Sequence, residues 1–191
     1  MTFEQAWNVV KMPIYHGTST KYLPDIMREG LKPTATIPDV HARQLIEEFD
    51  YDEDDDDFWS QLYSYGVRDR LKHPADYAVA AAGHWSRTMM RDNPLTYDAL
   101  MDSKDKRFDE DNLPVILEMP GGTWEEEAID GWEDDPIGYS GFGDDEWVKT
   151  QNTIPPERIK VFAQANPDMT VGQFIEMMQN RSKEMGLHGD F

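Results

Sequence analysis

Apolar residues follow two periodicities along this chain, one typical of strands and one typical of helices. Short apolar runs predict strands at Met12–Tyr15 and at Leu113–Met119. Alternation of apolar and polar positions predicts another strand within 58–71. Two more are expected at 144–150, which begins with carboxylates, and at 154–162, which begins with a proline-led turn. The pattern therefore predicts several short strands spread over the whole chain.

A helix is predicted directly after the first strand. Helical spacing begins near Tyr22 and continues to about Arg28, where Leu23, Ile26 and Met27 are expected on the buried side. Gly30 follows as a left-handed terminator, because glycine adopts positive φ without a steric cost.

Helices are also predicted between the other strands and at the C-terminus. The segment at about 170–186 has a single apolar stripe and opens with a capping sequence, Thr170 to Gln173. Further helices are expected at about 2–10, 39–49 and 74–91. Strands with helices inserted between them predict one α+β domain over residues 1–191.

The charge of the chain indicates which classes of binding partner are favoured. It has 38 acidic and 18 basic residues, which gives a formal net charge of −20 over 191 residues. Nucleic-acid binding depends largely on Lys and Arg, so a nucleic-acid partner is disfavoured. A basic protein partner, or mimicry of nucleic acid, is favoured instead.

An acidic insertion is predicted at about 47–57, where nine of eleven residues are carboxylates. Such a block repels itself and is typical of a solvated loop. It does not fit a calcium loop, because Asp57 stands where glycine is needed and Tyr63 where a bidentate Glu is needed. No metal site is expected.

Other sequence features bear on compartment and chemistry. The chain has no cysteine, which excludes disulfides and thiolate nucleophiles. No run approaches the ~20 apolar residues of a membrane helix, and no targeting segment is recognised. We therefore expect a cytoplasmic protein without a membrane partner.

The most informative stretch for chemistry is Ile14-Tyr15-His16-Gly17-Thr18-Ser19. A strand that ends at His16 leaves an imidazole and the bare backbone of Gly17 facing whatever lies beyond. The alternative is a histidine at a strand end without a ligand. Thr18 and Ser19 have an alternative role as caps of the following helix.

This stretch, followed by a short helix and Arg28–Pro33, resembles the opening of the ADP-ribosyltransferase superfamily. The resemblance implies that His16 and Gly17 hold the adenosine ribose and the nicotinamide amide of NAD, with Thr18 beside them.

Two later segments resemble the same superfamily in the expected order. Tyr65-Gly66-Val67 with Ala75–Ala78 looks like its second element, which implies that Tyr77 stacks on the nicotinamide ring, with Tyr65 as the substitute. Residues 145–149, with the Ile-Pro-Pro-Glu turn that follows them, are similar to the third element of the superfamily. This similarity implies that Glu146 is the catalytic carboxylate. The trio resembles the His-Tyr-Glu branch, to which poly(ADP-ribose) polymerases and diphtheria toxin belong.

The resemblance implies both a fold and an activity. The fold is a mixed or antiparallel split β-sheet with flanking helices. The activity is NAD-dependent mono-ADP-ribosyl transfer to a macromolecule, with a protein as the preferred acceptor. A carboxylate such as Glu146 would stabilise the ribosyl cation formed when nicotinamide leaves, as in glycosidases. NAD is expected as the substrate, and no metal is required.

The acceptor and two rival functions stay open. Asp144 stands two residues before Glu146, where arginine- or guanine-modifying members have Glu or Gln. RNA 2′-phosphotransferases share the His-Gly-Thr opening but use several arginines, and no Lys or Arg lies between Phe108 and Val148. The rivals are an NAD glycohydrolase and a non-catalytic acidic protein that blocks a partner or mimics nucleic acid. By analogy, a phage or bacterial effector could combine these roles.

Overall fold

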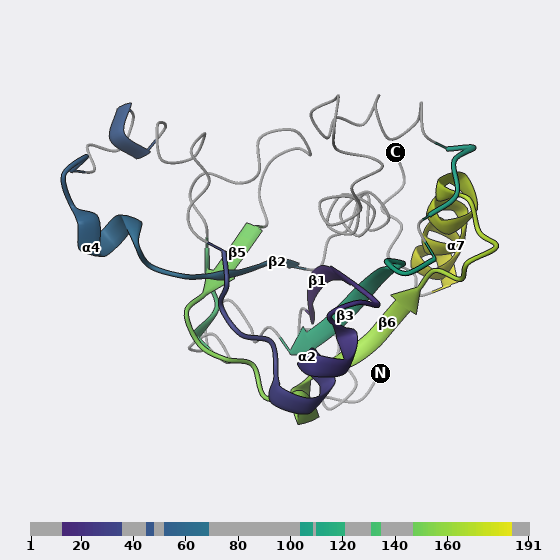
Figure 1. Ribbon diagram of the computed structural model, residues 1–191, viewed down its shortest axis with the longest axis horizontal. Coiled ribbons are helices and arrows are strands. Elements are labelled where there is room, and N and C mark those ends of the chain that lie inside the picture. The colour runs from purple at the N-terminus through teal and green to yellow at the C-terminus, as the bar shows by residue number, and fades with distance from the viewer. Residues whose placement is uncertain are drawn as a thin grey trace, which may run out of the picture.

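The computed structural model describes residues 13–35, 45–47, 52–68, 104–108, 110–120, 131–134 and 147–184. At its centre is an antiparallel sheet with the strand order β4-β5-β2-β1-β3-β6 (Figure 1). The strands are β1 (Pro13–Ser19), β2 (Ser64–Arg68), β3 (Pro114–Pro120), β4 (Glu133–Asp134), β5 (Trp147–Thr150) and β6 (Lys160–Gln164). Together with the helices described below, this sheet confirms the α+β class.

Strand β1 is longer than the sequence pattern predicts. It pairs with β3 in a continuous antiparallel register from Pro13↔Pro120 to Ser19↔Pro114. The prediction that this strand covers Met12–Tyr15 and ends at His16 is therefore wrong. The physical reason is that the ladder with β3 pairs residues 16–19 along one edge of β1, whatever their local preference.

Helix α2 (Leu23–Glu29) follows β1 and ends at Gly30 as predicted. Gly30 has φ of +90°, and its N–H donates to the Ile26 carbonyl at 2.8 Å. Its ψ of 167° is extended, so the residue is not left-handed helical in the strict sense. A Cβ here would lie 2.4 Å from the Ile154 carbonyl oxygen, which explains the glycine. Met27 is 40% exposed, so its predicted place on the buried side is wrong.

No side chain caps the N-terminus of α2. Its N-cap residue is Tyr22, without a side-chain cap hydrogen bond. The alternative role of Thr18 and Ser19 as caps is therefore wrong, because both residues belong to β1 and are buried there.

The described part of the acidic segment is exposed, as predicted, and some of it is helical. Residues 52–57 are all exposed, and α4 (Asp56–Trp59) begins among them. Asp55 caps this helical turn by accepting a hydrogen bond from the Phe58 N–H at 3.0 Å. Carboxylates at a helix N-terminus also interact favourably with the helix dipole. Part of the charge run thus serves local structure.

The strands predicted in the second half of the chain are confirmed: β3 lies within one residue of 113–119 at each end, and β6 begins within the predicted 154–162 but ends two residues beyond it. β5 is described from Trp147 onward, and the proline-led turn forms the 3₁₀ helix η2 (Pro156–Arg158) before β6. The helices predicted at about 2–10 and 74–91 lie outside the described residues. Of the one predicted at 39–49, residues 45–47 are described and are helical.

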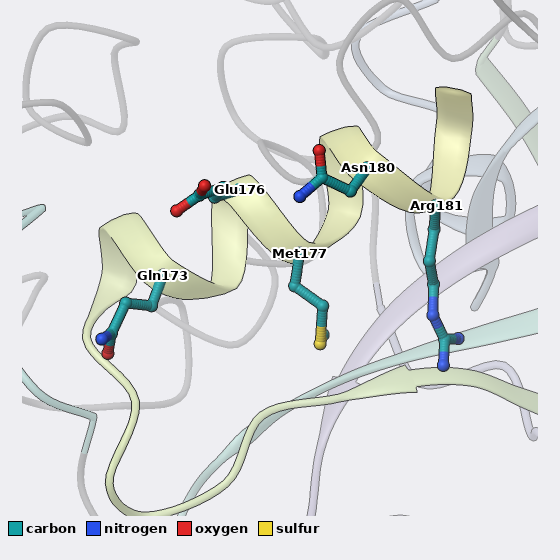
Figure 2. A pocket seen from close by; sticks show the side chains of 5 residues that line it. All are labelled: Gln173, Glu176, Met177, Asn180 and Arg181. Carbon is teal, nitrogen blue, oxygen red and sulfur yellow. The ribbon is translucent and has the colours of Figure 1, made fainter. Parts of the chain in front are cut away.

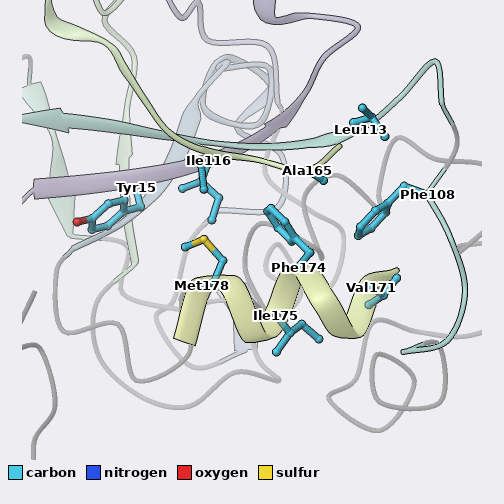
Figure 3. Packing of buried hydrophobic residues seen from close by; sticks show 10 residues of the cluster. Tyr15, Phe108, Leu113, Ile116, Ala165, Val171, Phe174, Ile175 and Met178 are labelled. Carbon is cyan, nitrogen blue, oxygen red and sulfur yellow. The ribbon is translucent and has the colours of Figure 1, made fainter. Parts of the chain in front are cut away.

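Helix α7 (Val171–Glu184) covers one face of the sheet. Its predicted apolar stripe is confirmed, since Val171, Phe174 and Met178 are 0% exposed (Figure 3). They pack with Tyr15 and Ile116 from the sheet. Fully burying a side chain of this size stabilises the fold by about 1.5–3 kcal/mol. This face is therefore a main source of stability.

The start of α7 has the predicted capping box. Gln173 N donates to Thr170 Oγ1 at 3.3 Å, and Thr170 N donates to Gln173 Oε1 at 2.9 Å. These two bonds satisfy backbone donors that a helix N-terminus leaves unpaired.

The opposite face of the sheet has its own apolar cluster. Ile14 and Leu117 pack there with Trp132, Val148 and Ile154, and α2 and η2 adjoin this cluster. Ile14 and Tyr15 enter different clusters because successive side chains of a strand point to opposite faces. In the described ranges, no helix is both apolar enough and long enough to cross a membrane.

Candidate functional site

The three sequence windows that carry the candidate residues converge on neighbouring strands. Residues 14–19 lie in β1, 65–67 lie in β2, and 147–149 lie in β5. β2 pairs with β1 on one side and with β5 on the other (Figure 1). Segments far apart in the sequence therefore form one continuous part of the sheet.

Two of the candidate residues, Tyr77 and Glu146, lie outside the described residues. Glu146 directly precedes Trp147, the first residue of β5, along the chain. Their assigned roles stay predictions.

His16 stands where the β1–β2 ladder ends. Within the described residues this ladder has the pairs Ile14↔Arg68 and Tyr15↔Val67. The next residue of β1, His16, places its ring Nδ1 2.7 Å from the Tyr65 carbonyl oxygen. The imidazole thus connects the two strands one residue past their last backbone pair.

This hydrogen bond fixes the tautomer of His16. A carbonyl oxygen only accepts, so Nδ1 must carry the proton and donate it to Tyr65. In the neutral ring Nε2 then has a free lone pair and acts as an acceptor.

The surroundings keep the imidazole neutral. Burial lowers the pKa of His16 from its ordinary value of 6.5, and the hydrogen bond to the Tyr65 carbonyl opposes this effect only in part. A neutral His16 near pH 7 presents Nε2 as an acceptor, which suits a ligand hydroxyl or amide N–H.

The neighbours of His16 differ in accessibility. Gly17 is half-buried and pairs with Ile116 of β3. Thr18 is only 4% exposed, and Ser19 is fully buried. His16 and Gly17 therefore offer more surface to a ligand than Thr18, whose predicted contact with NAD stays a prediction.

Tyr65 contributes through its backbone. The centroid of its ring lies 6.1 Å from that of Tyr63, and the residue packs against the small cluster of Leu45 and Tyr63. The atom of Tyr65 that meets His16 is the carbonyl oxygen. Sequence reasoning singled out the ring and missed the carbonyl, which every residue type has.

Lys149 is another residue that the sequence did not single out. It is 9% exposed and stands opposite Tyr65 in the β2–β5 ladder. Its Nζ lies 4.8 Å from the ring centroid of Tyr63 and 3.9 Å from Glu133 Oε1. The signal in the sequence was a lysine directly after the apolar residues Trp147 and Val148 of a predicted strand. The cation–π contact of Lys149 joins β5 to Tyr63, the residue directly before β2.

A separate open hollow of about 430 Å³ lies along α7. It is lined by Gln173, Glu176, Met177, Asn180 and Arg181. Figure 2 shows Met177 and Arg181 reaching from α7 toward the neighbouring strand. Arg181 donates a hydrogen bond to the Phe162 carbonyl, and its Cζ lies 5.6 Å from the centroid of the Phe162 ring. None of these residues belongs to the predicted site.

Comparison of the chain with known protein families, characterised proteins and solved structures found no match. Among the residues with described positions, no group of His, Asp and Glu side chains is arranged to hold a metal ion. The resemblance to ADP-ribosyltransferases therefore rests on the motif residues of the sequence.

Proposed function

We propose that this protein is an NAD-dependent mono-ADP-ribosyltransferase that transfers ADP-ribose to a protein acceptor. The observation that supports this most is the adjacency of β1 and β2, which contain His16 and Tyr65, and of β5, which directly follows Glu146. A histidine with a fixed acceptor nitrogen, held where β1 and β2 stop pairing, adds to this support. The antiparallel sheet agrees with the fold that the resemblance implies.

His16 and Gly17 would bind the dinucleotide. In the proposed complex His16 Nε2 accepts a hydrogen bond from a hydroxyl of the adenosine ribose. The backbone of Gly17 pairs with the amide of nicotinamide, and the missing side chain allows close approach. The half-buried position of both residues provides surface for these contacts.

The proposed reaction exchanges one bond at the C1′ carbon of the nicotinamide ribose. The C1′–N bond breaks, and its electron pair leaves with nicotinamide, whose ring Tyr77 would hold by stacking. The ribose passes through a cationic state that the Glu146 carboxylate stabilises. The acceptor nucleophile then bonds to C1′, and its proton passes to Glu146 and on to solvent.

Transfer from labelled NAD tests this function. Wild-type protein, Glu146→Gln and the matched control Asp145→Asn are incubated with labelled NAD and a cell lysate. We expect label on a protein with wild type and Asp145→Asn, and none with Glu146→Gln. The proposal fails if Glu146→Gln labels as well as wild type, or if wild type neither labels a protein nor releases nicotinamide. Nicotinamide release without label assigns NAD glycohydrolase activity instead.

The charge of the chain favours a second candidate, a non-catalytic protein that occupies a basic partner. Its net charge is −20, and residues 52–57 are exposed. Partner binding that survives Glu146→Gln and weakens steeply with added salt would support this role. Binding that is insensitive to salt would contradict it.

A further inference from the structure

Gly66 of β2 lies in a space that admits no side chain. A Cβ built there would lie 2.5 Å from Ile14 Cγ2, 3.2 Å from the Tyr15 carbonyl oxygen and 3.4 Å from Trp132 Cη2. Ile14 is 0% exposed and Trp132 is 1% exposed. Both are held in the same apolar cluster, so neither can turn away into solvent. The space therefore requires glycine.

The contact with Tyr15 links Gly66 to the candidate site. The Tyr15 carbonyl belongs to the peptide group that joins Tyr15 to His16. A methyl group on residue 66 would press against Ile14 and that peptide, and would push β1 away from β2. The hydrogen bond of His16 Nδ1 to the Tyr65 carbonyl is 2.7 Å long, and such bonds extend to about 3.2 Å. A displacement of about 0.5 Å is therefore enough to weaken it.

We infer that Gly66 is a positioning residue for His16. It keeps β1 close enough to β2 for Nδ1–H to donate to the Tyr65 carbonyl, and this bond leaves Nε2 as the acceptor. Without the bond the ring proton is free to move to Nε2, which then donates. This inference deepens the proposed function, because it rests on the use of Nε2 to bind a ribose hydroxyl of NAD.

The test compares Gly66→Ala with Gly172→Ala. Gly172 is a matched control on α7, where a Cβ would lie 3.0 Å from the Lys104 carbonyl oxygen. Nitrogen-15 NMR of the histidine rings reports which nitrogen of His16 carries the proton, and calorimetry reports NAD affinity. We expect Gly66→Ala to lose the proton on Nδ1 and to bind NAD about tenfold more weakly, the effect of one hydrogen bond. Gly172→Ala is expected to keep both properties.

The results separate the inference from the proposed function. If Gly66→Ala keeps the Nδ1 proton, Gly66 does not position His16 and the inference is overturned. If wild type binds no NAD but Gly66→Ala loses the Nδ1 proton, the positioning role stands and the proposed function fails.

A double variant covers the case in which Gly66→Ala does not fold. Ile14→Ala removes the Cγ2 atom that would lie 2.5 Å from the new methyl group. Gly66→Ala combined with Ile14→Ala is then expected to fold and to protonate Nδ1, as Ile14→Ala alone does. A folded double variant with an unprotonated Nδ1, beside a protonated Ile14→Ala, overturns the inference, because removal of the closest contact with the new methyl group then fails to restore the hydrogen bond of His16. An unprotonated Nδ1 in Ile14→Ala itself, where Gly66 is intact, overturns the inference.

Discussion

Replacement of Phe174 by alanine should remove a large part of the stability of the fold. Phe174 is 0% exposed, and its ring meets that of Phe108 edge to face at 5.9 Å between centroids. Truncating a buried Phe to Ala costs about 3–5 kcal/mol. Domains are typically stable by about 5–15 kcal/mol, so the variant loses a third or more of an average value. For a chain of this size we expect the Tm to fall by about 6–20 °C.

Thermal unfolding followed by circular dichroism measures this effect. Glu176→Ala is the matched control, because Glu176 is exposed on the same helix. Exposed substitutions usually change stability by less than about 0.5 kcal/mol, so its Tm should stay within about 2 °C of wild type. Equal Tm values for Phe174→Ala and Glu176→Ala would refute the packing of α7 onto the sheet.

Three further predictions concern charged groups. Burial lowers the pKa of His16 in the folded state, so wild type should lose stability as pH falls from about 6.5 through that lowered pKa. His16→Gln should lack this loss. Urea midpoints of wild type and His16→Gln that change equally between pH 8 and 5 would contradict the prediction. Hydrogen bonds from Lys32 and Arg28 lower the pKa of Glu29 to about 2, so its contribution is present above about pH 4.5 and lost as pH falls through 2. Glu29→Gln should therefore be slightly less stable than wild type at pH 7, and this difference should shrink as pH falls from about 4.5 to 2 and should be smaller in high salt. A difference at pH 2 that equals the one at pH 7 would be inconsistent with the ion pairs. Arg181→Ala should lower the free energy of unfolding by about 1–2 kcal/mol, because it loses the hydrogen bond to the Phe162 carbonyl and the contact with the Phe162 ring. A Tm equal to that of wild type would exclude a stabilising role for Arg181.

Elements with local signals could be predicted from the sequence. The apolar stripe of α7 and the reciprocal bonds of Thr170 and Gln173 depend on residues within a few positions of one another. The end of α2 at Gly30 is likewise a local signal, although the contact with the Ile154 carbonyl that requires glycine there is not.

The length of β1 could not be predicted in this way. Residues 16–19 have no marked strand preference, and their extended backbone depends on pairing with β3, which lies far along the chain. Met27 shows the opposite error. Its spacing fits an apolar stripe, but α2 is short and buries no residue fully, so one side of the stripe stays in solvent.

The sequence could predict which residues belong to the candidate site, but not the contacts that hold them in place. The motif singled out His16 and Tyr65, and the fold brings them together. That contact uses a backbone carbonyl, which carries no sequence signal. The packing that surrounds Gly66 is equally hidden, because it joins β1 with Trp132 from a distant part of the chain.

The central claim, that His16 binds NAD through Nε2, is tested most directly by adding NAD to the protein and following the nitrogen-15 NMR signals of the His16 ring. The chain has five histidines, and His16→Gln identifies the resonance of interest. The account predicts a saturable shift of the His16 Nε2 signal as NAD rises to about 1 mM, a common upper range for enzyme substrates, while Nδ1 stays protonated. An Nε2 signal that does not move over this range would contradict it.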